Sequence, residues 1–235
     1  MNDNPARHPP PLVRWTTRSV TCDAGWEAAY ARFETPAQEV RKFLARLRRL
    51  GADRRPRESR VVELFCGRGN GLVALERMGF TKIEGVDLSE ALLRRYSGPA
   101  QLYLGDCREL RFEGESKDLV VVHGGLHHLP AFPEDLDRVL GEMRRVLRPG
   151  GCLMLVEPWT TPFLRVANTV CTWRAVRRLW PRMDAMAEMN EREGEMYLRW
   201  LAEGPAILAL LDRHFEPRLR RLRYGKLLYV GAKRG

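Results

Sequence analysis

The sequence predicts a single α/β domain built around a mostly parallel sheet. Three observations support this prediction: short apolar runs alternate with helical patterns after Arg60, a glycine-rich turn follows the first run, and acidic residues end the next two. With 235 residues, the chain can bury a substantial core but is too short for two ordinary enzymes joined by a linker.

The expected strands and helices follow from hydrophobic periodicity. One amphipathic helix is expected over 134–147, and residues 158–214 are expected to be helical, with breaks near Pro181 and Gly204. The strands are short apolar runs bounded by turn residues, at 61–65, 82–86, 101–104, 119–122, 152–157, 219–223 and 227–232. This alternation brings the carboxyl ends of the parallel strands to one edge of the sheet.

The segment before the first strand has its own signals. Residues 1–14 are rich in proline and lack periodicity, so we expect them to be disordered. Thr35 is predicted to cap a helix that ends near Gly51, because Pro36 suits its first turn and Gln38 completes a capping box.

Composition argues against several classes of protein. The formal net charge is +10, but the 40 basic residues are spread along the chain among 30 acidic ones, a pattern that does not favour a nucleic-acid partner. The 5 cysteines are scattered and form no CxxC pair, so we expect neither disulfides nor a metal site. No apolar run suits a membrane span or a signal peptide, and a cytoplasmic location is therefore expected.

The glycine-rich turn is the first candidate site. Gly67, Gly69 and Gly71 follow the first strand, where glycine lets the chain turn sharply and lets a ligand lie against bare backbone. Such a turn alone is weak evidence, since enzymes that bind NAD use one as well. The acid Glu63 on the strand before it suits the ammonium and sulfonium cations of S-adenosylmethionine better than it suits a phosphate.

Two further acids are expected at the same edge of the sheet. Asp87 ends the second strand, 20 residues after Gly67, at the spacing of an acid that accepts hydrogen bonds from both ribose hydroxyls. Asp106 ends the third strand, where its carboxylate can accept from an adenine amino group. Together with Glu63, these acids converge on one crevice.

From Arg60 to Pro158 the chain resembles the class I S-adenosylmethionine-dependent methyltransferases, in particular the small-molecule group. The resemblance rests on the runs ELFCGRGNG, GVDLS, GDC, DLVVVHGGLHHL and LRPGG. It implies a Rossmann-like, seven-stranded sheet with helices on both faces and an antiparallel last strand. It also implies S-adenosylmethionine as the cofactor and S-adenosylhomocysteine as the product. His123 departs from the family pattern, which more often has a small or polar residue there.

The predicted cofactor-binding residues lie at successive strand ends and in the N-terminal cap. They are Glu63, Gly67, Gly69, Asp87, Leu88, Asp106, Cys107 and His123, with Tyr30 and Arg32 closing over the carboxylate of the cofactor. Residues 15–235 are expected to form one domain in four parts: a helical cap (15–59), the cofactor-binding core (60–157), a helical lid that holds the acceptor (158–214) and the C-terminal strands (215–235).

His123 and His127 are the candidate general bases, since a neutral imidazole can take a proton at cytoplasmic pH. His123 is the stronger candidate because it ends the fourth strand of the core, which should point at the transferred methyl group. His127 lies in a Leu-His-His-Leu run for which a structural role is favoured. Glu157, at the end of the fifth strand, is expected either to line the acceptor side or to be a solvated strand end.

We therefore expect methyl transfer to an O, N or C atom of a small molecule, such as a sugar, a natural product or a quinone-like or lipid-like compound. The six tryptophans and a methionine stripe lie outside residues 60–157, which favours an anionic or partly apolar acceptor. Three alternatives stay open: an RNA or protein methyltransferase, a non-catalytic subunit of this fold that binds the cofactor or only a partner protein, and an NAD-dependent oxidoreductase. The oligomeric state is left open.

One segment suggests a further partner. Residues 163–180 mix valine, phenylalanine and tryptophan with four arginines, as in a helix that lies on a membrane surface. Peripheral membrane contact is therefore kept as a hypothesis.

Overall fold

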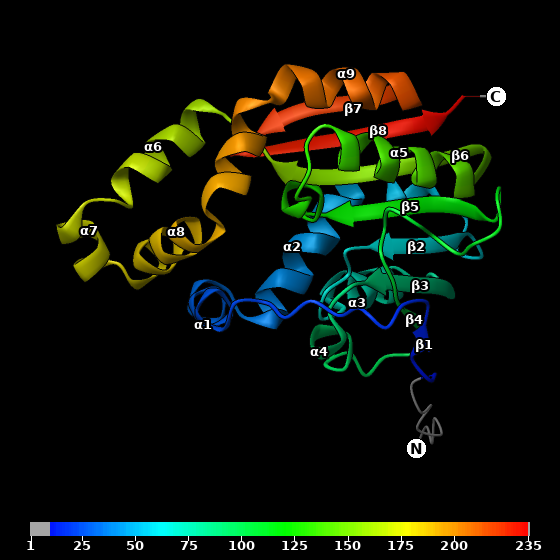
Figure 1. Ribbon diagram of the computed structural model, residues 1–235, viewed down its shortest axis with the longest axis horizontal. Helices are drawn as coiled ribbons and strands as arrows, with labels where there is room; N and C mark the ends of the chain where they lie inside the picture. Colours follow the sequence, from blue (N-terminus) through cyan, green and yellow to red (C-terminus); the bar gives the residue numbers. More distant parts are fainter. Residues whose placement is uncertain (1–9, 235) are drawn as a thin grey trace.

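The computed structural model describes residues 10–234, which form an eight-stranded sheet covered by helices on both faces (Figure 1). The strand order is β1-β4-β3-β2-β5-β6-β8-β7. The strands are β1 (Val13–Arg14), β2 (Arg60–Leu64), β3 (Lys82–Asp87), β4 (Gln101–Leu104), β5 (Lys117–His123), β6 (Leu147–Pro158), β7 (Phe215–Arg223) and β8 (Lys226–Lys233).

The helices come before, between and after these strands. They are α1 (Ala24–Phe33), α2 (Pro36–Arg49), α3 (Asn70–Arg77), α4 (Glu90–Leu93), α5 (Glu134–Val146), α6 (Pro162–Val170), α7 (Arg174–Leu179), α8 (Pro181–Ala202) and α9 (Gly204–His214), with short 3₁₀ turns η1 (Ala52–Arg54) and η2 (Leu126–His128). No helix within residues 10–234 has the length and apolar character to cross a bilayer.

The sheet matches the expected class. All neighbouring strands are parallel except β8, which runs antiparallel to both β6 and β7. Two apolar layers cover it, one formed with α2 and α3 and the other with α5 and α9. Because β2 lies between β3 and β5, the strand order reverses at β2, and ligands bind at such a switch point in open α/β sheets.

The predicted helix after Thr35 is confirmed. The Thr35 side chain accepts from the backbone N–H of Gln38, and the Gln38 side chain accepts from the backbone N–H of Thr35, so both halves of the capping box form. Val40, Phe43 and Leu47 on this helix are buried. The helix therefore packs its apolar stripe onto the sheet, close to the ends of β5 and β6.

The N-terminal segment differs from the expectation. Residues 1–9 of the segment predicted to be disordered lie outside the described residues, whereas Val13 and Arg14 form an eighth, edge strand beside Tyr103 and Leu104. The segment then crosses the ends of β4 and β3, where Val20 donates to the Leu88 carbonyl.

The helical region after β6 forms an arm that projects away from the sheet (Figure 1, left). It consists of α6, α7 and the first part of α8. Gly194 (φ 55°, ψ −134°) breaks α8, and the second part of that helix returns to the core, where Trp200 is buried. The arm is tied to the N-terminal cap by contacts between α1 and α8.

Candidate functional site

The glycine turn lies at the switch point, between β2 and α3. Gly67 (φ 52°) and Gly69 (φ 79°) adopt left-handed conformations that favour glycine, as expected. The turn starts earlier than predicted, at Phe65, whose φ of 56° is unusual for a bulky residue. Strain of this kind concentrates at functional sites. The sequence carried no signal for it, because a phenylalanine does not indicate a left-handed conformation.

Glu63 is buried directly beneath the first turn of α3. A Cβ added to Gly71 would lie 1.8 Å from Glu63 Oε1, so the carboxyl group occupies the space that a side chain would need. Its Oε1 lies 3.1 Å from His123 Nδ1, and its Oε2 has no partner among the residues that the structure describes. Burial raises the pKa of Glu63 well above its usual range, with the charges of Glu39 and Asp87 adding to the shift.

Asp87 is held at the end of β3 by backbone groups. Its Oδ2 accepts from the N–H of Gly67 and its Oδ1 from the N–H of Ser89, both at 2.8 Å. Burial raises the pKa of this carboxyl group, and these hydrogen bonds oppose the shift. Each oxygen keeps a lone pair for a further donor, as the predicted contact with ribose hydroxyls requires.

Asp106 ends β4 at the expected edge, but its carboxylate is already engaged. Arg108 donates to both of its oxygens, over distances of 2.6–3.2 Å, and also donates to Asp135 at 3.0 Å. Burial raises the pKa of Asp106, but the hydrogen bonds from Arg108 outweigh it and the pKa is lowered overall. Accepting from an adenine amino group would therefore require Arg108 to move. The sequence interpretation missed this network.

Leu88 and Cys107 occupy the positions after these two acids. Leu88 is half-buried under the N-terminal segment, whose Val20 N–H bonds to its carbonyl at 2.9 Å. Cys107 is buried, and burial raises the pKa of its thiol. The N-terminal segment thus covers the edge where an adenosine group is expected.

Tyr30 and Arg32 of α1 contact other protein groups in this structure, and their contact with the cofactor carboxylate stays a prediction. The Tyr30 hydroxyl donates to Glu39 at 2.5 Å, and the Tyr30 ring lies 5.3 Å from the guanidinium carbon of Arg68 in the glycine turn. Arg32 instead pairs with Asp184 and Glu188 of the arm. Its role is therefore to join the cap to the arm, because both acids lie on α8 rather than at the glycine turn.

The two histidine candidates lie in different surroundings. The His123 ring is buried and stacked on Phe43, with centroids 4.3 Å apart and an interplanar angle of 7°. Burial, with the charges of Arg46 and Lys42, lowers its pKa to about 3. A group of this pKa stays neutral and is a weak base. His123 remains a candidate contact for the cofactor, since its Nε2 has no partner within residues 10–234.

His127 has the better geometry for proton transfer. Its Nδ1 lies 2.7 Å from Glu157 Oε2, while Glu157 Oε1 accepts from the N–H groups of Gly125 and Leu126 at 2.8 Å. Glu157 is fully buried and is therefore not a solvated strand end. A carboxylate that fixes one ring nitrogen determines the tautomer and orientation of the imidazole.

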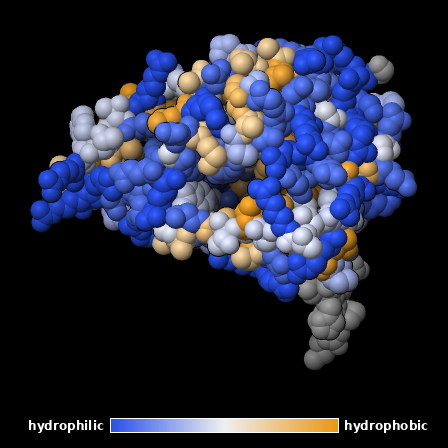
Figure 2. Space-filling view, in the orientation of Figure 1, coloured by the Kyte–Doolittle hydropathy of each residue, from blue (hydrophilic) through white to orange (hydrophobic). Residues whose placement is uncertain are grey.

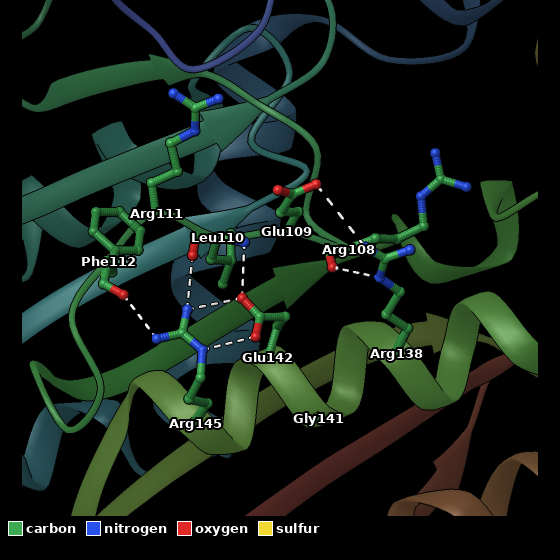
Figure 3. Close-up of a pocket in the computed structure, with 9 residues that line it drawn as sticks. All are labelled: Arg108, Glu109, Leu110, Arg111, Phe112, Arg138, Gly141, Glu142 and Arg145. Atoms are coloured by element: carbon green, nitrogen blue, oxygen red, sulfur yellow. Dashed lines mark hydrogen bonds and ion pairs between the residues drawn. The ribbon is translucent and has the colours of Figure 1, made fainter.

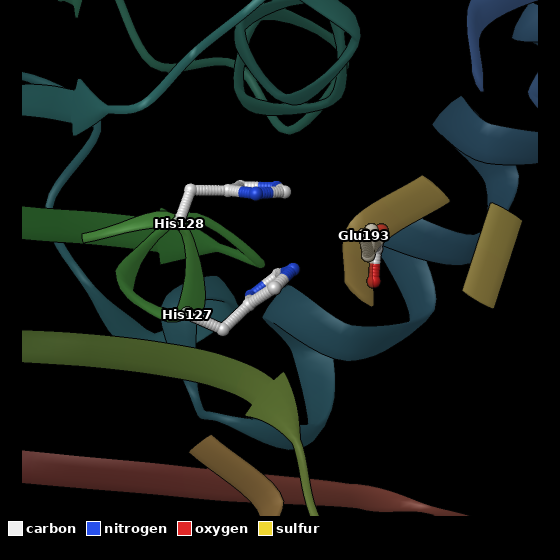
Figure 4. A group of neighbouring side chains, drawn as sticks. All are labelled: His127, His128 and Glu193. Atoms are coloured by element: carbon white, nitrogen blue, oxygen red, sulfur yellow. The ribbon is translucent and has the colours of Figure 1, made fainter. Parts of the chain in front are cut away.

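His128 and Glu193 lie beside His127, each contributing an atom to a group whose members are within 4.8 Å of one another (Figure 4). The sequence interpretation missed Glu193, which comes from α8 and also accepts from Trp26 Nε1 at 2.9 Å. The group joins η2, the arm and the cap. His127 is the buried member of the group, whereas His128 is exposed and Glu193 is half-buried.

A cluster of cations lies next to His123, a feature that the sequence interpretation also missed. Lys42 Nζ and the guanidinium carbon of Arg46 lie 5.7 and 5.8 Å from the centroid of Phe43. Lys226, the first residue of β8, lies on the same face of the sheet at its carboxyl edge, opposite the end of β6. Burial, and next the charge of Arg46, lowers the pKa of Lys226 to about 8.

The cation cluster carries uncompensated charge. Lys42 pairs with a glutamate after α1, but neither Arg46 nor Lys226 forms an ion pair with any residue from 10 to 234. Figure 2 shows the surface hollowed where the arm meets the edge of the sheet. The cation cluster lies beside the carboxyl ends of β5 and β6.

A separate depression lies on the other side of the sheet, between α5 and residues 108–112 (Figure 3). Its polar groups satisfy one another: Arg145 donates to Glu142 and to the carbonyls of Leu110 and Phe112. It therefore has the character of a structural network rather than that of a binding site.

The residues at the switch point fit S-adenosylmethionine. Gly67 leaves the backbone bare, Asp87 is positioned with free lone pairs, and two buried polar atoms, Glu63 Oε2 and His123 Nε2, have no partner in the described part of the chain. Buried polar groups are normally hydrogen-bonded, so a polar ligand here would satisfy both atoms.

Comparison with known proteins identifies the family of the central domain. Residues 62–155 match the family model described as a methyltransferase domain. The chain is 35% identical over 167 residues to a phthiotriol/phenolphthiotriol dimycocerosates methyltransferase of Mycobacterium leprae, covering 68% of this chain and 57% of that protein. It is 34% identical over 106 residues to a demethylmenaquinone methyltransferase of Staphylococcus aureus, covering 42% of each. The chain thus spans about half the length of these relatives.

Solved structures show the same fold. A protein from Pyrococcus horikoshii superimposes with a TM-score of 0.65 at 20% identity, covering 91% of this chain and all of that one. A TehB-like SAM-dependent methyltransferase from Corynebacterium glutamicum gives 0.55 at 16% identity, covering 79% of this chain and 86% of that one. Residues 62–155 thus form a methyltransferase domain, in a chain with the Rossmann-like fold of the class I S-adenosylmethionine-dependent methyltransferases.

Proposed function

We propose that this protein transfers a methyl group from S-adenosylmethionine to a partly apolar small molecule of the quinone-like or lipid-like class. The observation that carries the proposal is the half-buried, backbone-held Asp87 beside the left-handed glycine turn. The names of the relatives from Mycobacterium and Staphylococcus support the acceptor class. A cytoplasmic location is part of the proposal, supported by five cysteines that are all free thiols.

The acceptor would lie in the recess beside β5 and β6. Phe43 provides an apolar surface there, and the unpaired cations of Arg46 and Lys226 favour an acceptor that carries a carboxylate, phosphate or phenolate. Buried positive charge without a partner is costly, and an anionic acceptor would offset that cost.

The chain's own residues would do three things in the reaction. Asp87 and the glycine turn would fix the cofactor, which supplies an electrophilic methyl group when bound. The apolar recess would exclude water and align the acceptor, an effect worth about 7–11 kcal/mol when the geometry is good. Where the acceptor must lose a proton, His127 would accept it at Nε2, with Glu157 holding its Nδ1.

Isothermal titration calorimetry with S-adenosylhomocysteine tests the cofactor assignment. We expect binding by the wild-type chain and a loss of about 100-fold in Asp87→Ala, because buried N–H groups lose their acceptor along with the ribose contact. Asp212→Ala, at a half-buried acid of α9 that pairs with Arg220 far from the glycine turn, is the matched control. Unchanged affinity in Asp87→Ala would refute the ribose assignment.

The acceptor class is tested separately, by following methyl transfer from labelled cofactor. Hydroxylated naphthoquinones, phenolic lipids and sugars would be compared by mass spectrometry. Transfer to sugars alone would contradict the proposed class while leaving the cofactor site intact.

A further inference from the structure

The outer surface of the arm is unusually apolar. Five large apolar side chains within 18 residues of α6 and α7 are between 56% and 83% exposed: Phe163, Val166, Trp173, Leu179 and Trp180. Five exposed large apolar side chains in one short segment, three of them aromatic, indicate an interaction site. The arm projects from the rest of the molecule (Figure 1), so these side chains are free to reach a partner.

The same segment carries only positive charge. No aspartate or glutamate occurs from residue 158 to residue 183, whereas five arginines do. Arg165, Arg174 and Arg178 are exposed and have no ion pair within residues 10–234, while Arg177 pairs with Asp184 and Glu191. The exposed surface of α6 and α7 thus combines aromatic side chains with three arginines that form no ion pair within residues 10–234.

The patch continues onto the neighbouring turn between β7 and β8. Tyr224 is 64% exposed, and its ring meets that of Phe163 edge-on with centroids 5.7 Å apart. Arg223 lies over the Tyr224 ring, 4.8 Å from its centroid. Aromatic rings with a polar edge, next to arginine, are the side chains that favour the boundary between lipid headgroups and acyl chains.

We propose that this surface, made of the exposed residues of α6 and α7 with Tyr224, docks the protein on an anionic phospholipid membrane. The complementarity of charge selects the occupant: three unpaired arginines beside exposed tryptophans match a negatively charged bilayer surface. The helices are too short to span it, with 9 residues in α6 and 6 in α7, so the contact is interfacial.

Docking would place the methyltransferase where apolar acceptors reside. The arm leads through α8 back to Glu193, next to His127 at the candidate site. A lipid-like acceptor could thus be taken from the surface that the arm touches. The docking surface itself is independent of the identity of the acceptor.

Vesicle flotation of the full chain tests the proposal. We expect the wild-type protein to float with vesicles of phosphatidylcholine and phosphatidylglycerol but not with phosphatidylcholine alone. The variant Arg165→Glu/Arg174→Glu/Arg178→Glu should lose about 100-fold in partitioning, because each cation contributes about 1 kcal/mol near an anionic surface. Trp173→Ser/Leu179→Ser/Trp180→Ser should lose membrane binding to a similar degree.

Two controls separate the patch from general effects. Arg213→Glu changes an exposed arginine of α9, and Leu198→Ser changes an exposed leucine of α8, 64% exposed, outside the patch. Both should float like the wild type, and circular dichroism should show that every variant is folded.

Three results would overturn the proposal: no flotation of the wild type, flotation that the patch variants retain, or equal loss in the controls. Light scattering addresses the rival occupant. A concentration-dependent dimer that the tryptophan variant abolishes, without vesicle binding, would assign the patch to a second copy of the chain.

Discussion

The two halves of the site differ in how their polar groups are satisfied. At the cofactor half, the fold itself holds the charged group: the backbone N–H groups of Gly67 and Ser89 bind Asp87. At the acceptor half, Arg46 and Lys226 are half-buried cations without an ion pair among the described residues. The donor site is therefore preorganised by its own sheet, whereas the acceptor site keeps two cations that no ion pair holds in place.

The same contrast holds for apolar surface. The strands that carry the cofactor half are buried on both faces, and Val61, Val62 and Leu64 of β2 are fully inaccessible. The arm beyond the acceptor half instead leaves Trp173, Leu179 and Trp180 exposed. A rigid site suits a cofactor that is always the same molecule. An open surface suits an acceptor that varies or is held in a membrane. Three experiments test this comparison.

The largest effect is expected at the rigid half, in Gly71→Ala. The new Cβ would lie 1.8 Å from Glu63 Oε1, so α3 or the buried carboxyl must shift. We expect a loss of about 3 kcal/mol in the free energy of unfolding, measured with urea, together with weaker binding of S-adenosylhomocysteine. Gly114→Ala is the control, because its Cβ would meet only ordinary contacts. Equal stability of the two variants would show that the turn is not rigid.

An intermediate effect of the opposite sign is expected at the acceptor half, in Lys226→Met. Burial lowers the folded-state pKa of Lys226 to about 8, below its ordinary value of 10.5. Below pH 8 the lysine is charged in both the folded and the unfolded chain, and burying its charge destabilises the folded state. Above pH 10.5 the lysine is neutral in both, and this destabilisation disappears. Removing it should therefore stabilise the protein by about 2 kcal/mol at neutral pH.

The pH dependence gives the check on this prediction. Thermal unfolding of the wild type should show stability that rises with pH between about 8 and 10.5 through this group, a rise that Lys226→Met lacks. Lys82→Met, at an exposed lysine of β3, should retain it. A destabilised Lys226→Met at neutral pH would mean that the charge is balanced within the folded chain.

The smallest effect is expected at the joint between the cap and the arm, in Arg32→Ala. Arg32 is half exposed in its pairs with Asp184 and Glu188, and such pairs contribute about 0.2–1 kcal/mol. Unfolding by urea should show a loss within that range, with unchanged affinity for S-adenosylhomocysteine in calorimetry. A large loss of affinity would instead support the contact between Arg32 and the cofactor carboxylate that the sequence predicts.

The sequence by itself determined the sheet, the order of its elements and the edge at which the site lies. Local signals suffice for these features: the capping box at Thr35 fixes the start of α2, and Asp87 comes to the glycine turn because parallel strands end at one edge. The left-handed conformation of Phe65 had no such signal, since tertiary packing imposes it against the preference of the residue.

Only the tertiary structure decided which side chains share a pocket. His123 and His127 are alike in the sequence, but one is stacked under α2 with its pKa lowered to about 3 and the other is oriented by Glu157. Lys226 and Arg46 are 180 residues apart and meet only because β8 returns beside β6. The pKa and orientation of a side chain depend on all of its neighbours in space. The sequence alone does not show which residues those neighbours are.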